Sequence, residues 1–450
     1  MTAKKLLFVL LAVLAIQTSL RPQDNSRISL FPRASEDVIL ALANVQPIVP
    51  GSTELNGAAT VFNQILWDDL EFAGVFTLAG RSFYPDKPIR RPEVDIDYDA
   101  WNELPFKINF IVTGNISPFQ DGRLRMELGV YDIRQRKQAF SRAYTGDINQ
   151  TRTMAHRWAD EIVHQLTAGA SRGIADTKIA YVSQKGKARE IHIMDYDGYN
   201  PTQFTNNGSL NLFPSWSADN SKLAFVSYRP SPEVVIYSIL DGLRLPFPMF
   251  NTLASTPAIS PSGQEIAFSM RTAGGGSNIF ISPLDGSRLR SLTNNNTATA
   301  IETTPTWSPS GRQIAYISGM PGQIFIRDID GSNQRRIIRE GGDSDGVTWS
   351  PDGRWLAFHW KPRRSSSYDI FVADSASGII RQITSGNSSN ESPSWAPDSR
   401  HLAFQSNRSG SWQIYIMRLD GIDSKDGKGV RQITTQGINR SPAWSGYYNK

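Results

Sequence analysis

The sequence predicts a small N-terminal α/β domain followed by an all-β six-bladed propeller that is closed by the C-terminal strand. The main observation is a phrase, Pro-x-Trp-Ser, then a turn and a Leu/Ile-Ala-Phe/Tyr strand, that recurs over about the last 270 residues. A repeat of about 40–50 residues built from short strands and turns is typical of β-propellers. The anchors of the phrase are Trp216, Ile259, Trp307, Trp349, Trp395 and Trp444.

The first residues indicate a secretory signal peptide, assigned to residues 1–21. Lys4 and Lys5 precede an apolar run, Leu6–Ile16, that is too short to span a bilayer. A buried N-terminal helix is the alternative interpretation. The chain has no cysteine, which excludes disulfides, thiol nucleophiles and lipoprotein processing. We therefore expect an exported protein without direct membrane insertion.

Residues 27–170 lack the repeat and are predicted to form the α/β domain. Apolar side chains spaced three or four apart predict a helix over 53–71, capped by Ser52 or Thr53 and ended by Gly74. The remaining elements are predicted from apolar runs and alternation. They are a strand over 38–49, a β-rich run over 106–116, a hairpin of 124–131 with 138–144, and a second helix over 151–166. A linker follows at 168–173.

Residues 176–450 are predicted to form the propeller. The number of copies of the Leu/Ile-Ala-Phe/Tyr strand gives the number of blades. The six copies begin at Ile179, Leu223, Ile266, Ile314, Leu356 and Leu402. The first copy lacks its Pro-x-Trp phrase, while the last phrase, around Trp444, lacks its following strand. The two incomplete copies complete each other, so the C-terminal strand should pair into the first blade and remove an exposed edge. The blade near 234–253 diverges most, and Pro246 and Pro248 are expected to replace a regular fourth strand there.

The sequence carries no constellation that predicts catalysis, a cofactor or a metal. Gly342-Asp-Ser-Asp-Gly346 matches the nucleophile-elbow pattern, but that motif needs a strand before it and a helix after it. The five histidines form no zinc pattern, and the turn aspartates before glycine are explained by hairpin chemistry. The net charge is +5, with basic residues scattered rather than gathered, which argues against nucleic acid as a partner. The repeated tryptophans are expected to pack between blades.

The segments just before each anchor are predicted to line one mouth of the central channel, where propellers usually bind their partners. A solvated rim with no partner is the alternative. The predicted partner-binding residues at this mouth are Phe213, Thr256, Glu302, Thr304, Asp343, Asp345, Asn390, Glu391, Asn439 and Arg440.

The whole chain after the signal resembles the TolB family, periplasmic components of the Tol–Pal system. The most particular stretches are Lys178-Ile-Ala-Tyr-Val-Ser183, Asp195-Tyr-Asp-Gly-Tyr-Asn200 and the terminal Pro442-Ala-Trp-Ser445. The resemblance implies a monomeric, non-enzymatic adaptor that acts in outer-membrane invagination during cell division and in envelope integrity. It also implies that the lipoprotein Pal binds the propeller mouth and that an N-terminal segment with Arg27 and Ile28 reaches inner-membrane TolA.

Two other classes of protein compete with the adaptor, namely a propeller enzyme and a generic binding propeller. A propeller-capped serine peptidase needs a hydrolase domain of about 200 residues, and the region before the repeats is too short for one. A propeller lyase is the other enzyme to consider. A generic exported propeller that binds a glycan or peptide is the stronger alternative.

Overall fold

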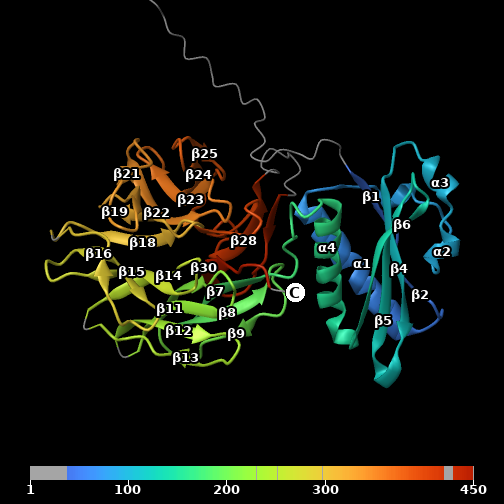
Figure 1. Cartoon of the computed structure of the whole chain (residues 1–450), viewed down its shortest axis with the longest axis horizontal. Coiled ribbons are helices and arrows are strands. Elements are labelled where there is room, and N and C mark those ends of the chain that lie inside the picture. Colours follow the sequence, from blue (N-terminus) through green and yellow to red (C-terminus); the bar gives the residue numbers. More distant parts are fainter. Residues whose placement is uncertain (1–37, 230, 251, 296, 420–428, 449–450) are drawn as a thin grey trace, which may run out of the picture.

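The computed structural model describes residues 38–229, 231–250, 252–295, 297–419 and 429–448. Figure 1 shows an N-terminal domain of sheet and helices beside a larger propeller. The predicted signal peptide and the segment with Arg27 and Ile28 lie outside the described residues. Within the described part of the chain, no helix combines the length and the apolar character needed to cross a membrane.

The N-terminal sheet has the order β3-β1-β4-β5-β6, with β2 also paired to β4. Its β1 runs parallel to β3 and β4, whereas β4, β5 and β6 are antiparallel. The strands are β1 (Ile39–Leu42), β2 (Gln46–Pro47), β3 (Thr77–Leu78), β4 (Phe110–Pro118), β5 (Leu124–Asp132) and β6 (Lys137–Gly146).

The single strand predicted over 38–49 is wrong, because the structure divides it into β1 and β2. Between them the backbone of Val45 bonds to a side chain of the first helix instead of to a strand. The Val45 N–H donates to Asn63 Oδ1 at 2.8 Å, and its carbonyl accepts from Asn63 Nδ2 at 3.1 Å. Both short strands still pair with β4.

Two long helices, α1 (Thr53–Ala73) and α4 (Thr151–Leu166), pack together on one face of this sheet. Ser52 is the N-cap of α1, since its Oγ accepts from the Leu55 N–H at 3.3 Å, and Gly74 ends the helix with φ 64°. Short helices and turns of helix complete the domain: α2 (Pro92–Asp95), α3 (Tyr98–Asn102), and the 3-10 turns η1 (Arg81–Phe83), η2 (Gln120–Gly122) and η3 (Ile148–Gln150).

Six four-stranded antiparallel sheets form the propeller, which confirms the predicted blade number. Blade 1 has β30 (Ile438–Trp444), β7 (Lys178–Lys185), β8 (Ala188–Asp195) and β9 (Thr202–Gln203). Blade 2 has β10 (Asn211–Trp216), β11 (Lys222–Tyr228), β12 (Pro232–Ser238) and β13 (Arg244–Leu245). Blade 3 has β14 (Ala254–Ile259), β15 (Glu265–Arg271), β16 (Ser277–Pro283) and β17 (Arg290–Ser291).

The other three blades follow the same order from the innermost strand outward. Blade 4 has β18 (Glu302–Trp307), β19 (Gln313–Ser318), β20 (Gln323–Asp328) and β21 (Arg335–Arg336). Blade 5 has β22 (Gly342–Trp349), β23 (Trp355–Pro362), β24 (Asp369–Asp374) and β25 (Ile380–Gln382). Blade 6 has β26 (Asn390–Trp395), β27 (His401–Ser406), β28 (Gln413–Arg418) and β29 (Val430–Gln432).

The C-terminal strand closes the ring, as predicted. In β30, Trp444 pairs with Ile179 of β7, and the Ser445 N–H donates to the Lys178 carbonyl at 2.9 Å. Blade 1 is therefore built from both ends of the propeller sequence. In blade 2, by contrast, the expected loss of the fourth strand is wrong. The two-residue β13 ends just before Pro246, so the prolines follow the strand and do not replace it.

The tryptophan anchors join neighbouring blades, as predicted. The Trp216 indole N–H donates to the Ala443 carbonyl at 3.0 Å, and Trp307 donates to the Ala258 carbonyl at 2.9 Å. Each acceptor is the residue just before the anchor of the preceding blade. Trp395 makes the same bond to the Thr348 carbonyl at 3.3 Å, whereas Trp349 donates to the Gly353 carbonyl of its own blade.

Candidate functional site: the channel mouth

Each blade's innermost strand carries a β-bulge at the same place, three residues before the anchor. The pairing of the inner strand with its neighbour shifts there in all six blades. The residue at the bulge has a left-handed backbone with φ between 48° and 62°. These residues are Phe213, Thr256, Thr304, Gly346, Ser392 and Ser441. Only Gly346 suits this conformation, so five blades hold a strained residue at this position.

The strained residues are held by bonds from the blade before. The Thr304 N–H donates to Thr256 Oγ1 at 3.2 Å, and the Ser441 N–H donates to Gln405 Oε1 at 2.8 Å. A third bond, from the Ser392 N–H to His359 Nδ1, spans 3.3 Å. Since the inner strands also contact one another in a closed ring, these bonds form a belt around the central channel.

At the bulge, two consecutive residues of each inner strand are more exposed than the residues on either side of them. The positions three and four residues before the anchor are half-exposed or exposed, whereas the positions two and five before it are buried. We call these twelve half-exposed or exposed residues the channel mouth. They are Leu212 and Phe213, Ser255 and Thr256, Thr303 and Thr304, Asp345 and Gly346, Glu391 and Ser392, and Arg440 and Ser441.

Six predicted partner-binding residues lie in the channel mouth, namely Phe213, Thr256, Thr304, Asp345, Glu391 and Arg440. Three others do not, because the bulge places them five residues before the anchor, between two blades. Glu302, Asn390 and Asn439 are at most 5% exposed. A partner on the surface cannot reach them without parting the blades.

The buried asparagines hold blades together. Asn390 Nδ2 donates to Asp369 Oδ1 of the preceding blade at 2.9 Å, and Asn439 Nδ2 donates to Gln413 Oε1 at 2.9 Å. Glu302 occupies the equivalent place in blade 4, and burial raises the pKa of its carboxyl above the usual range. A sequence signal for this role exists, because the residue five positions before the anchor is polar in five of the six blades. The prediction placed three of these residues, Glu302, Asn390 and Asn439, at the mouth instead.

Blades 5 and 6 give the mouth an acidic sector around a buried histidine. Asp345 accepts from Thr304 Oγ1 at 2.8 Å, while Asp343, the tenth predicted residue, accepts from the Tyr368 hydroxyl at 2.6 Å. Burial lowers the pKa of His359 although Asp345, Glu391 and Asp343 act to raise it. His359 is therefore neutral, which agrees with its Nδ1 accepting a backbone N–H.

The mouth opens on the propeller face that lies away from the N-terminal domain. That domain contacts residues at the opposite ends of the inner strands, where strands turn into their neighbours. Tyr196, in the turn after β8, donates to Asp69 of α1, and His401, at the start of β27, bonds to the Phe72 carbonyl. We call this contact region the joint. Among the described residues, the N-terminal domain therefore covers the joint and not the mouth.

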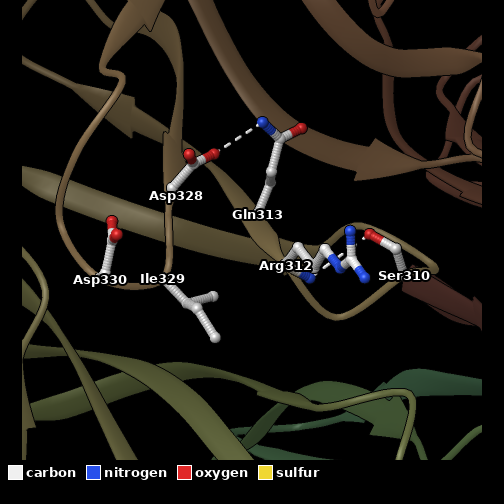
Figure 2. A pocket seen from close by; sticks show the side chains of 6 residues that line it. All are labelled: Ser310, Arg312, Gln313, Asp328, Ile329 and Asp330. Atoms are coloured by element: carbon white, nitrogen blue, oxygen red, sulfur yellow. Dashed lines mark hydrogen bonds between the residues drawn. The ribbon is translucent and has the colours of Figure 1, made fainter.

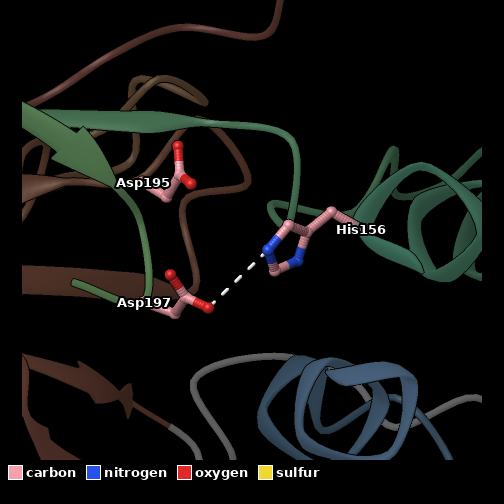
Figure 3. Close-up of side chains that lie close together, drawn as sticks. All are labelled: His156, Asp195 and Asp197. Carbon is pink, nitrogen blue, oxygen red and sulfur yellow. Dashed lines mark ion pairs between the residues drawn. The ribbon is translucent and has the colours of Figure 1, made fainter. Parts of the chain in front are cut away.

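One cluster in the described residues has the donor types of a metal site, and it lies at the joint. The ligand atoms of His156, Asp195 and Asp197 fall within 4.8 Å of one another (Figure 3). Both carboxylates already bind a cation: Asp195 pairs with Lys178, and Asp197 pairs with Arg152. Because their charges are already neutralised by these cations, the three side chains form a network of ion pairs and not a site for a divalent metal.

Two other features offer no site. Ser344 of the nucleophile-elbow match lies inside strand β22 and is 1% exposed, so it has neither the strand-to-helix turn nor the access of a nucleophile. A surface hollow beside blade 4 is lined by Ser310, Arg312, Gln313, Asp328, Ile329 and Asp330 (Figure 2). Its polar groups bond to each other, as Gln313 Nε2 does to Asp328 at 2.8 Å.

Comparison with protein families gives matches to both domains. A model described as the TolB amino-terminal domain matches residues 37–139, and a model described as the TolB beta propeller domain matches residues 163–361 and 346–448. Together these matches cover most of the chain.

Curated relatives give the same family at modest identity. A Tol-Pal system protein TolB from Desulfosudis oleivorans is 32% identical over 179 residues, which is 40% of each chain. One from Gluconobacter oxydans is 29% identical over 307 residues, covering 57% of this chain and 66% of that protein. One from Bordetella pertussis is 28% identical over 276 residues, or 60% of each. This chain therefore matches between 40% and 66% of the length of these relatives.

A solved structure agrees with the fold of the whole molecule. The crystal structure of TolB from Acinetobacter baumannii superimposes with a TM-score of 0.73 at 23% sequence identity. It covers 92% of this chain and 97% of that chain, so both the two-domain order and the propeller are shared.

Proposed function

Because the chain belongs to the TolB family, we propose that it is a non-enzymatic periplasmic adaptor of the Tol–Pal system. In this proposal residues 1–21 are an export signal, residues 27–170 are the α/β domain and residues 176–450 are the propeller. The protein links inner-membrane TolA to the outer-membrane lipoprotein Pal. It thereby acts in outer-membrane invagination during cell division and in envelope integrity.

The observation that carries the lipoprotein assignment is the channel mouth itself. Its residues occupy equivalent positions in six similar blades, yet their chemistry differs from blade to blade. Blade 2 presents Leu212 and Phe213, whereas blades 5, 6 and 1 present Asp345, Glu391 and Arg440. A scaffold alone needs no such variation, since the blades are held by the anchors and the buried polar residues. The variation therefore supports recognition of a specific partner surface.

The mouth also has the composition of a protein-binding site. Phe213 is 39% exposed on a rigid, strained backbone, so it can fill a pocket of a partner at little entropic cost. The acidic pair Asp345 and Glu391 and the basic Arg440 lie on other blades of the same ring and can fix the orientation of that partner. An exposed aromatic side chain in the same ring as charged groups is typical of a protein or peptide interface.

Calorimetric titration with the Pal-type lipoprotein of the same cell tests this assignment. We expect the wild-type protein to bind, and Glu391→Lys to weaken binding at least about tenfold by reversing one rim charge. Asp330→Lys is the matched control, because Asp330 is exposed on the opposite face, and it should bind like wild type. Equal binding by both variants, or binding of a glycan instead of the lipoprotein, would contradict the proposal.

The TolA assignment rests on the N-terminal segment and is tested separately. We expect deletion of residues 22–37 from the exported protein to abolish TolA binding and to leave lipoprotein binding unchanged. Alanine at Arg27 and Ile28 should reproduce the loss. Undiminished TolA binding by the deleted form would place that contact elsewhere in the chain.

A further inference from the structure

Helix α1 ends against the propeller, which supplies hydrogen-bond donors to its last turn. The carbonyl groups at a helix C-terminus carry partial negative charge and have no partner within the helix. The last turn of α1 contains no basic residue. Instead, the Phe72 carbonyl accepts from His401 Nε2 at 2.9 Å, and the Glu71 carbonyl accepts from Arg418 Nη1 at 3.1 Å. Blade 6 therefore caps α1 from outside the domain.

Asp69 of the same helix is the centre of the joint. It is 5% exposed, and its two oxygens bond to two different elements. Asp69 Oδ2 lies 2.8 Å from His156 Nδ1 of α4, and Asp69 Oδ1 accepts from the Tyr196 hydroxyl of blade 1 at 2.5 Å. The carboxylate of Asp69 thus connects its own helix, α1, to α4 and to the propeller.

His156 continues this chain of contacts to the propeller. Its second ring nitrogen, Nε2, lies 3.6 Å from Asp197 Oδ2, the ion pair drawn in Figure 3. Both ring nitrogens therefore face carboxylates, one from each domain. Burial alone would lower the pKa of His156, but Asp69 and Asp197 outweigh burial and raise it to about 9. The buried ring is an imidazolium near neutral pH.

The charges that face His156 balance only when its proton is present. Three carboxylates surround the ring: Asp69 from α1, and Asp195 and Asp197 from the end of β8 and the turn after it. Arg152, on α4 itself, pairs with Asp197, and Lys178 of β7 pairs with Asp195. Arg431 of β29 lies near enough to act on Tyr196. Three negative charges thus meet two cations and one imidazolium, which leaves no charge for a divalent metal to neutralise.

We propose that the proton on His156 is a latch that couples the N-terminal domain to blades 1 and 6, and that losing this proton loosens the joint. A neutral ring carries no charge, so Asp69 would lose its buried cation and Asp197 would keep only its ion pair with Arg152. The contacts weakened in this way include those between the two domains, namely Asp69 with Tyr196 and His156 with Asp197. The latch goes beyond the proposed adaptor role, because it concerns coupling inside the chain and not a partner.

Tyr196 and Asp197, the two partners that also have shifted pKa values, do not release the latch in the same range. Burial and Asp69 raise the pKa of Tyr196 well above its ordinary value, so its hydroxyl keeps donating to Asp69. Burial raises the pKa of Asp197, although His156 and Arg152 oppose the rise. Of these three groups, His156 is the one whose pKa lies between pH 7 and 10.

Energy transfer between two dyes measures the coupling directly. The chain has no cysteine, so cysteines at Gln135 in the N-terminal domain and Ser287 in blade 3, both exposed, take the dyes specifically. We expect constant transfer efficiency from pH 7 to 8 and a change with a midpoint near 9. His156→Gln should show the loosened value at pH 7 and no transition. His164→Gln, an exposed position on the same helix, should titrate like wild type.

A wild-type signal that stays flat from pH 7 to 10, or a His156→Gln variant that titrates like wild type, would overturn the latch. If His156→Gln does not fold, Asp197→Asn replaces it, since this change removes only the propeller carboxylate. Its midpoint should fall by about one pH unit, and an unchanged midpoint would also overturn the latch. Added Zn²⁺ should leave transfer unchanged at pH 9, whereas restored coupling that requires His156 would assign the cluster to a metal instead.

Discussion

The two ends of the propeller are built from the same repeat and use charge in opposite ways. At the joint, charges are buried and paired across the domain boundary, as Asp69 is with His156 and Tyr196. At the channel mouth, Asp345 and Glu391 lie exposed or half-exposed on the inner strands. Buried pairs fix one geometry, because breaking them leaves an uncompensated charge. Half-exposed groups cost little to leave free, so they remain available to a partner.

The comparison suggests that the joint contributes stability and the mouth contributes recognition. Removing the charge at the centre of the joint should therefore have the largest effect. Asp69→Ala leaves the imidazolium of His156 and the Tyr196 hydroxyl without their acceptor, and we expect the free energy of unfolding to fall by about 3–5 kcal/mol. Urea denaturation measures the loss. Asp68→Ala, one residue away and half-buried, should cost far less.

Raising the pH should weaken the joint without affecting the mouth. The pKa of His156 rises from 6.5 to about 9 on folding, so its contribution is complete below pH 6.5 and is lost as the pH rises through 9. The shift corresponds to roughly 3 kcal/mol of stability. Thermal denaturation at a series of pH values should show this loss in wild type. His156→Gln should flatten the curve, and a wild-type curve that is equally flat would contradict the assignment.

The mouth should respond to backbone changes more than to charge changes. Gly346→Ala places a Cβ 2.8 Å from His359 Nδ1 at φ 62°, and we expect it to destabilise the protein by about 1–2 kcal/mol. Ser392→Gly relaxes the equivalent strained position in blade 6 and should stabilise the protein by up to about 1 kcal/mol. Opposite signs for the two variants in the same denaturation assay would support the shared bulge.

The smallest effect is expected for a charge at the mouth. Glu391→Gln keeps the shape of the side chain and can still bond to Gln405, its partner at 3.0 Å. We expect its free energy of unfolding to stay within about 0.5 kcal/mol of wild type. A loss as large as that of Asp69→Ala would show that the mouth is structural and would remove the contrast between the two ends.

The propeller scaffold could be predicted because each copy of the repeat is a short, continuous stretch of sequence. The blade number and the closure through Trp444 follow from counting phrases, and both were correct. Which residues of the inner strands are buried could not be predicted, because the bulge that decides it has no sequence signal. Thr256, Thr304 and Ser392 rarely adopt a left-handed backbone, yet they do so here. The bulge therefore moved Glu302 and its equivalents into the blade interfaces.

The joint was invisible in the sequence for a different reason. Asp195-Tyr-Asp-Gly-Tyr-Asn200 was interpreted as a hairpin turn, which it is, but its buried contacts run to Asp69 and His156. Tyr196 and Asp69 lie 127 residues apart. No local pattern relates them, since their pairing depends on how two domains pack.

Photo-crosslinking tests most directly whether the mouth is the partner surface. A photoreactive amino acid at position 213, in the channel mouth, and another at position 330, on the opposite face, are compared in the presence of the Pal-type lipoprotein. We predict a crosslink from position 213 and none from position 330, with the yield at 213 reduced by Glu391→Lys. A crosslink from position 330 alone would contradict the account.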